Sequence, residues 1–118
     1  MKKAVDKDIV DWSKEAFPDL TMEAQLKKLD EEIGEWYDAI IGGSDDENEK
    51  ETADVYIVGR ILADRFDSNI GRYFLGMLLS RDIEWLERRV VEKMNINKSR
   101  QWKKENGVYK HKEKKNEN

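Results

Sequence analysis

Residues 29–54 read LDEEIGEWYDAIIGGSDDENEKETAD and decide the expected fold. This stretch holds two acidic pairs, Glu32 with Glu35 and Glu51 with Asp54, and the members of each pair are three residues apart. On an α-helix, residues at i and i+3 lie on one face, so each pair presents two carboxylates to the same region of space. The 15 residues between the pairs include a Gly-Gly turn, which allows an antiparallel helical hairpin with the pairs on facing helices.

The apolar residues around the first acidic pair predict a helix with one buried face. They step by three and four residues and comprise Leu26, Leu29, Ile33, Trp36 and Ile40, which is the spacing of an amphipathic helix. Thr21 is the expected N-cap, and Gly42 with Gly43 should end the helix after Ile41. The next helix, expected over residues 48–65 and capped by Ser44 or Asp46, is apolar on most sides. We therefore expect it to be the central helix, with a partner subunit covering any remaining apolar face.

The four carboxylates favour a metal site over a solvated surface. Carboxylates gathered beside apolar surface repel one another and lose hydration, at a cost of several kcal/mol unless a cation compensates. Oxygen ligands suit a hard ion, so Mg²⁺ is expected and Mn²⁺ is an alternative. A single acidic pair would be ordinary, because Asp and Glu are common in first helical turns and on exposed faces. Two pairs on consecutive helices indicate a metal site.

The composition indicates one all-α domain. The chain has 118 residues, 41% of them charged and 38% hydrophobic, with one proline and no cysteine. These values fit helices whose apolar residues form stripes, and the length allows one core, expected over residues 1–111. The N-terminal residues are charged where a signal peptide is apolar, and no apolar run approaches a membrane span. We expect a cytoplasmic protein without a membrane partner.

The charge is distributed unevenly along the chain. Residues 1–92 hold 13 Lys and Arg against 23 Asp and Glu, a net charge of −10, whereas residues 93–118 hold 9 against 3, a net charge of +6. A basic segment is typical of nucleic-acid or acidic partners, but it also suits the phosphates of a small substrate. Residues 112–118 have no apolar side chain, and we expect them to be a disordered tail.

Two further helices complete the expected architecture. A short amphipathic helix should run from about Val5 to Phe17, where Pro18 ends it. A long helix is expected from about Ile70 to Trp102, with a buried seam at Leu79, Ile83, Leu86 and Val90.

The seam of this last helix becomes polar where it should stay apolar. Its next positions are Lys93, Asn97 and Arg100, and such side chains are seldom buried without a partner. A phosphate chain would satisfy all three, and Trp102 or Tyr109 would then be placed to stack on a base. The alternative is a frayed helix end whose cations favour the C-terminal dipole. Three consecutive polar seam positions favour phosphate binding.

These motifs together resemble those of the MazG-like, all-α nucleoside triphosphate pyrophosphohydrolases. The acidic pairs and their spacing are similar to the family motif, and the residues around them also fit. The signature Lys93-x-x-x-Asn97-x-x-Arg100-x-Trp102, followed by Gly107-Val-Tyr109-x-His111, is similar to that of the dATP/dGTP pyrophosphohydrolase branch. The resemblance covers nearly the whole chain, from about Phe17 to His111.

The resemblance implies Mg²⁺-dependent cleavage of a (d)NTP to the monophosphate and pyrophosphate. It implies a four-helix-bundle-like fold that forms dimers or tetramers. The metal ligands would be Glu32, Glu35, Glu51 and Asp54, and the phosphates would contact Lys93, Asn97 and Arg100. Glu31 matches the first acidic residue of the family's EExxE run, and either it or Glu32 would orient the attacking water.

Two other interpretations of the sequence stay open. One is a non-catalytic helical adaptor that uses the basic C-terminal segment, although nucleic acid is not the expected partner of the leading hypothesis. The other keeps the fold and changes the substrate, as in phosphoribosyl-ATP pyrophosphohydrolases, which have a similar acidic pattern. The chain offers no Gly-rich phosphate loop and no arrangement of a nucleophilic Ser or Cys. Hydrolysis by a metal-activated water is the chemistry that remains.

Overall fold

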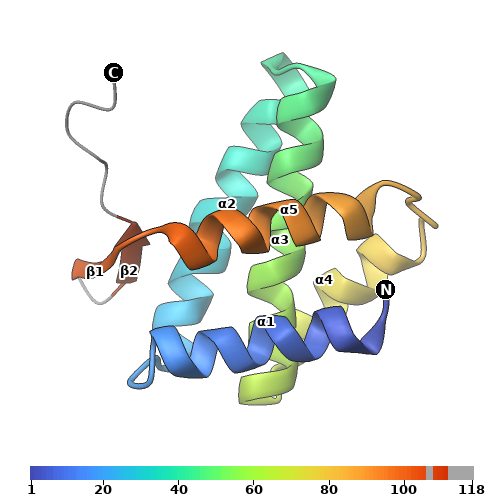
Figure 1. Ribbon diagram of the computed structural model, residues 1–118. Helices are drawn as coiled ribbons and strands as arrows, with labels where there is room; N and C mark the ends of the chain where they lie inside the picture. The colour runs from blue at the N-terminus through green and yellow to red at the C-terminus, as the bar shows by residue number, and fades with distance from the viewer. Residues whose placement is uncertain (106–107, 112–118) are drawn as a thin grey trace.

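The computed structural model describes residues 1–105 and 108–111, and these residues are mostly helical (Figure 1). They form five helices and a two-stranded sheet: α1 Lys3–Ala16, α2 Met22–Gly42, α3 Asp45–Phe66, α4 Asn69–Leu79, α5 Leu86–Ser99, β1 Trp102–Glu105 and β2 Val108–His111. The predicted helical fold class is confirmed, with a short hairpin added to it. The predicted disordered tail, residues 112–118, lies outside the described residues.

Three helices begin at side-chain caps, two of which the sequence analysis predicts. Thr21, Ser44 and Ser68 each accept a hydrogen bond from the backbone N–H three residues later, at 3.1, 3.1 and 3.3 Å. Such caps satisfy backbone donors that have no partner within the helix. The cap at Ser44 starts α3 at Asp45, one turn earlier than the predicted residue 48.

Helix α3 is the centre of the molecule, as predicted. Helices α1, α2, α4 and α5 all contact it, and α2 and α3 form the expected antiparallel hairpin (Figure 1). The buried side chains of α3 include Ala53, Val55, Tyr56, Ile57, Val58, Ile61 and Leu62. This nearly continuous apolar surface explains how a single helix can support neighbours on several sides. At its N-terminal end Asp45, Asp46 and Glu47 are exposed, whereas Glu51 and Asp54, further along the helix, are partly buried among the packed helices.

The predicted helix over residues 70–102 is wrong, because the chain breaks it twice. Helix α4 ends at Leu79, and the bend that follows contains Asp82 with φ of 51°, a left-handed conformation that cannot continue an α-helix. Helix α5 ends at Ser99, before strand β1. The physical reason is packing: α4 lies along one part of α3 while α5 crosses the α2–α3 pair elsewhere (Figure 1). One straight helix could not follow both paths.

Two residues assigned to buried seams lie on the surface. Leu79 is exposed, and the neighbouring Leu78 occupies the core in its place. Ile40 is 53% exposed because α2 extends beyond the core at its C-terminal end, whereas Leu29 is buried as predicted. Periodicity locates the face of a helix but does not say how far along the helix a neighbour covers it.

The hairpin of β1 and β2 packs against the connection between α1 and α2. The strands pair antiparallel, with Trp102 opposite His111. Tyr109 and Asp19 are joined by a side-chain hydrogen bond, and Lys104 Nζ lies 3.3 Å from Asp19 Oδ2. Within the described part of the chain, none of the helices combines the length and apolarity needed to cross a bilayer.

Candidate metal and phosphate site

A cleft of about 310 Å³ opens where α2, α3, α5 and the hairpin meet. Its lining combines carboxylates, cations and amides with aromatic and aliphatic side chains. The lining residues are Glu32, Glu35, Glu51, Asp54, Lys28, Lys93, Arg100, Gln25, Asn97, Trp12, Phe17, Leu20, Ala24, Ile57, Val58, Ile61, Trp102, Tyr109 and His111. The four predicted metal ligands and the five predicted substrate-binding residues all belong to this cleft.

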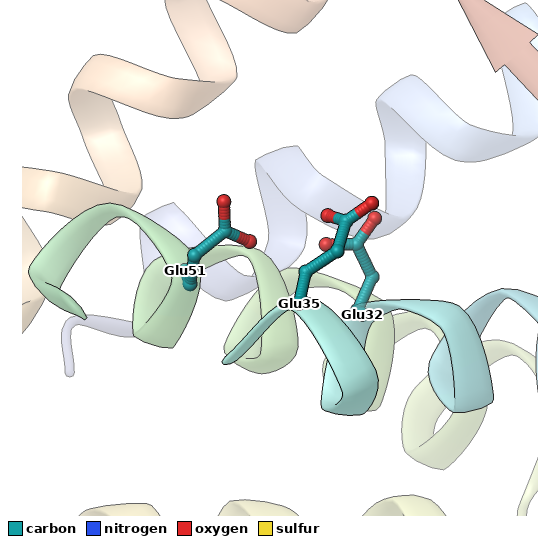
Figure 2. A group of neighbouring side chains, drawn as sticks. All are labelled: Glu32, Glu35 and Glu51. Atoms are coloured by element: carbon teal, nitrogen blue, oxygen red, sulfur yellow. The ribbon is translucent and has the colours of Figure 1, made fainter. Parts of the chain in front are cut away.

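Three of the predicted ligands form a compact group. Glu32, Glu35 and Glu51 each offer a carboxylate oxygen, and these oxygens all lie within 4.8 Å of one another. Glu32 and Glu35 come from α2 and Glu51 from α3, and their carboxyl groups point to the same side of the helix pair (Figure 2). The i and i+3 spacing on α2 and the antiparallel packing of α3 produce this convergence.

Two oxygens of this group lack a hydrogen-bonding partner. Glu32 Oε2 and Glu51 Oε2 are buried, and neither accepts a hydrogen bond from the described residues. Buried carboxylate oxygens are normally paired, and an unpaired one costs free energy. The free energy of the site therefore falls if a cation or a proton reaches these oxygens.

The fourth predicted ligand, Asp54, has a partner on the facing helix. Its Oδ1 lies 3.2 Å from Lys93 Nζ of α5. Asp54 is not part of the 4.8 Å group, although its charge raises the pKa of both Glu32 and Glu51. The structure thus brings all four carboxylates to one cleft and pairs Asp54 with a lysine of α5.

Burial and mutual repulsion raise the pKa values of the acidic residues. Burial and then the charge of Asp54 raise the pKa of Glu32 to about 7. Burial, Asp54 and Glu35 raise the pKa of Glu51 to about 7. Burial also raises the pKa of Asp54, against the opposing influence of Lys93. Carboxyl groups with such raised pKa values can exchange protons near neutral pH, and strongly shifted pKa values are concentrated at functional sites.

The polar continuation of the α5 seam faces the acidic residues. Lys93, Asn97 and Arg100 all line the cleft, and Asn97 is only 6% exposed. Arg100 is near enough to Asp54 for its charge to oppose the rise that burial causes in the pKa of that carboxyl. These three residues keep the helical spacing although the predicted long helix is broken, because α5 contains the first two and Arg100 is its C-cap. Cations and a buried amide opposite carboxylates are suited to an anionic ligand that is bound together with a metal.

Glu31, one of the two predicted water-orienting residues, lies outside this lining. Its carboxylate is 3.8 Å from Lys28 and 3.6 Å from Lys110 of β2, and it is partly exposed. Glu32, the other predicted residue, is buried and belongs to the group of three carboxylates. The helix places adjacent residues about 100° apart, so only one of the two can face the cleft.

The aromatic end of the cleft is formed by four rings in contact. Phe17 lies 5.2 Å from Trp12, 5.2 Å from Trp102 and 4.3 Å from Tyr109, measured between ring centroids. Trp102 Nε1 donates a hydrogen bond to the backbone oxygen of Asn97 at 3.1 Å. The predicted stacking residues Trp102 and Tyr109 thus belong to a larger apolar surface to which α1 also contributes.

Two α2 residues of the cleft, Gln25 and Lys28, were not among the predicted site residues. Lys28 Nζ lies 3.3 Å from Glu32 Oε1, and Gln25 is a buried amide in the cleft. Both precede the acidic pair on the same helix face, since Gln25, Lys28 and Glu32 step by three and four residues. That periodicity was a usable signal, but it does not show which helix face meets α5 and the hairpin.

In comparisons with known proteins, no family model, curated protein or solved structure matches the chain. The chemistry of the cleft follows from its own residues. Three converging carboxylates can hold a hard divalent cation, and the basic side chains opposite them can hold phosphate oxygens.

Proposed function

We propose that the chain is a Mg²⁺-dependent nucleotide pyrophosphohydrolase that cleaves a (d)NTP to the (d)NMP and pyrophosphate. The observation that supports this most directly is the group formed by Glu32, Glu35 and Glu51, with two unpartnered buried oxygens, in a cleft shared with Lys93 and Arg100. The motif resemblance to MazG-like pyrophosphohydrolases supports the same reaction. In this proposal the fold is the four-helix-type bundle of that family.

The carboxylates suit a magnesium ion, with manganese as the alternative. Glu32, Glu35 and Glu51 would hold it, and Asp54 would join them once separated from Lys93. All the donors are carboxylate oxygens, which is the preference of these hard ions. A bound ion supplies charge neutralisation for the polyphosphate and acidifies a water molecule.

In this proposal the other residues of the cleft bind the substrate, and Glu32 accepts the proton from the attacking water. Lys93 and Arg100 can neutralise phosphate oxygens, and the buried amide of Asn97 can donate to them. Water is added across the anhydride between the α- and β-phosphates, and the bond to the pyrophosphate breaks. Glu32, with its raised pKa, can take the proton that the water loses. Because the cleft combines these groups with an apolar end, a nucleoside triphosphate is the substrate class that fits best.

Homo-oligomerisation to a dimer or tetramer is part of the proposal. Large apolar side chains are exposed at the end of α2 and along α4: Tyr37, Ile40, Ile41, Ile70, Tyr73 and Leu79. A second copy of the chain would bury such surfaces. Sedimentation at micromolar concentration tests this, and a well-behaved monomer would contradict it.

The enzymatic proposal is tested with a panel of four dNTPs and Mg²⁺. We expect release of pyrophosphate, detected apart from inorganic phosphate, and loss of that release in Glu35→Gln and Asp54→Asn. Both variants should keep the helical circular dichroism of the wild type. The matched control is Glu15→Gln, because Glu15 is exposed and lies outside the cleft. Full turnover in either cleft variant would exclude the mechanism.

The same samples separate the rival interpretations. If no nucleotide is hydrolysed and an oligonucleotide binds with a steep salt dependence, the adaptor hypothesis is supported instead. If phosphoribosyl-ATP is hydrolysed and the dNTPs are not, the fold and the metal site stand and the substrate changes.

A further inference from the structure

Gln25 is a buried amide in the cleft that the proposed hydrolysis does not use. It is only 5% exposed, and it lies on the lining of the cleft. Its Nε2 makes one long contact, 3.5 Å to the backbone oxygen of Val58, and the described residues provide no other side-chain hydrogen bond for it. A primary amide has two donor hydrogens and a carbonyl acceptor, so most of this hydrogen-bonding capacity is unused.

The position of Gln25 along the cleft matches the far end of a nucleotide. It lies seven positions before Glu32 on α2, which corresponds to about 10 Å along the helix axis. The side chains of the antiparallel helix α3 that line the cleft change from acidic to apolar in the same direction, from Glu51 and Asp54 to Val58 and Ile61. The cleft therefore runs from carboxylates, past Lys28 and the α5 cations, to an apolar end that contains the Gln25 amide. A nucleotide bound along the cleft would place its phosphates at the carboxylate end and its base at the apolar end.

Two other polar groups at the aromatic rings are already engaged. Trp102 Nε1 donates to the backbone oxygen of Asn97 at 3.1 Å, and the Tyr109 hydroxyl is bonded to Asp19. Phe17 offers only an apolar ring. Gln25 is thus well placed to hydrogen-bond a flat heterocycle that enters among these rings.

We infer that Gln25 contacts the edge of the nucleobase and sets the preference among bases. This inference rests on the proposed function and adds a specificity-determining residue to it. Every base presents adjacent donors and acceptors on its edge, and a side-chain amide can form two hydrogen bonds to such a pair. Loss of the amide leaves the base edge unpaired, and the cost depends on which base it is.

The test measures kcat/KM of the wild type and of Gln25→Met for dATP, dCTP, dGTP and dTTP. Methionine keeps the length of the side chain and removes both polar atoms. We expect kcat/KM for the preferred base to fall about tenfold and the values for the other bases to fall less, so that the ratios between bases change. Inorganic tripolyphosphate with Mg²⁺ carries no base, and its inhibition constant should be the same in both proteins.

The chain provides a matched control, because its other glutamine, Gln101, is exposed and outside the cleft. Gln101→Met should leave all four values unchanged. Gln25→Asn, which keeps the amide and withdraws it by one methylene, decides the question if Gln25→Met does not fold, and it should also change the ratios.

The possible results distinguish a failure of this inference from a failure of the proposed function. Changed ratios between bases, with unchanged inhibition by tripolyphosphate, support the inference. An equal loss for all four dNTPs, or none, overturns it while the proposed function stands. If the wild type hydrolyses no nucleotide, the proposed function is wrong and so is this inference.

Discussion

Lys93 Nζ of α5 lies 3.2 Å from Asp54 Oδ1 of α3, so a cation of the chain itself pairs with one of the proposed metal ligands. Both side chains are mostly buried, with 21% and 12% of their surface exposed. A metal ion that binds Asp54 competes with this ammonium for the same carboxylate. The released ammonium can then bind a phosphate, which links the two binding events.

Replacing Lys93 with methionine should strengthen metal binding and weaken substrate binding. Without the competing ammonium, we expect Mg²⁺ to bind about tenfold more tightly in the absence of nucleotide, because a nearby positive charge is lost. Binding of inorganic tripolyphosphate should become weaker. Isothermal titration calorimetry measures both affinities.

The control for Lys93 lies on the same helix. Lys98 pairs with Asp8 at 2.7 Å on the surface, away from the cleft, so Lys98→Met should leave both affinities unchanged. Equal Mg²⁺ affinity in Lys93→Met and the wild type would show that the ion pair does not compete with the metal.

The raised pKa values of Glu32 and Glu51 should make stability depend on pH. In the folded chain both pKa values are about 7, above the ordinary value of 4.5. The unfolded chain loses these protons first as pH rises, so the contribution of the two groups to stability falls between about 4.5 and 7. Below this window both states are protonated, and above it the folded chain holds repelling charges.

Thermal or urea unfolding in EDTA should reveal this cost. The double variant Glu32→Gln, Glu51→Gln should match the wild type near pH 4.5 and exceed its free energy of unfolding above pH 7. Saturating Mg²⁺ should stabilise the wild type more at high pH, because the ion binds the ionised carboxylates. A difference between the proteins that does not change with pH would contradict the raised pKa values.

Glu31 and Glu32 should differ sharply in their effect on turnover, although they are adjacent. Glu31→Gln should change kcat less than about threefold, since this carboxylate lies outside the cleft lining and pairs with Lys28 and Lys110. Glu32→Gln should lower kcat by at least about a hundredfold, because Glu32 belongs to the carboxylate group and can take the proton. Steady-state release of pyrophosphate measures both, and equal losses would remove the distinction.

Two helical glycines should respond oppositely to alanine. A Cβ on Gly71 would lie 2.7 Å from the backbone nitrogen of Ala63 and 2.8 Å from the backbone oxygen of Gly59. Gly71→Ala should therefore destabilise the α3–α4 contact by about 2 kcal/mol. Gly34 has open space around its Cβ position, so Gly34→Ala should stabilise α2 by about 0.5–1 kcal/mol. Urea unfolding tests both, and a stable Gly71→Ala protein would contradict the tight packing of α4 on α3.

Local sequence rules accounted for much of the fold. Thr21 and Ser44 mark helix starts because side-chain caps act within one turn, and α2 ends at Gly42, one residue after the predicted end, with Gly43 as its extended C-cap. The acidic pairs share a helix face because the period of an α-helix requires it. Asn97 faces the cleft for the same reason, since the period of α5 does not depend on where the helix starts.

Contacts between distant segments decided what these rules could not. The break at Asp82 follows from the separate paths of α4 and α5 over α3, which no local pattern within residues 70–102 records. The same packing turns Leu78 inward instead of Leu79.

The sequence by itself determined helices α1, α2 and α3, the caps Thr21 and Ser44, and the helix faces on which the polar residues lie, because these depend on interactions within a few residues of one another. Only the tertiary structure decided that Lys93 reaches Asp54, that Glu31 lies outside the cleft and that Gln25 lies inside it. Those outcomes depend on where α5 and the hairpin cross the α2–α3 pair. That crossing is set by the packing of side chains from the whole chain, and periodicity along one helix contains no information about it.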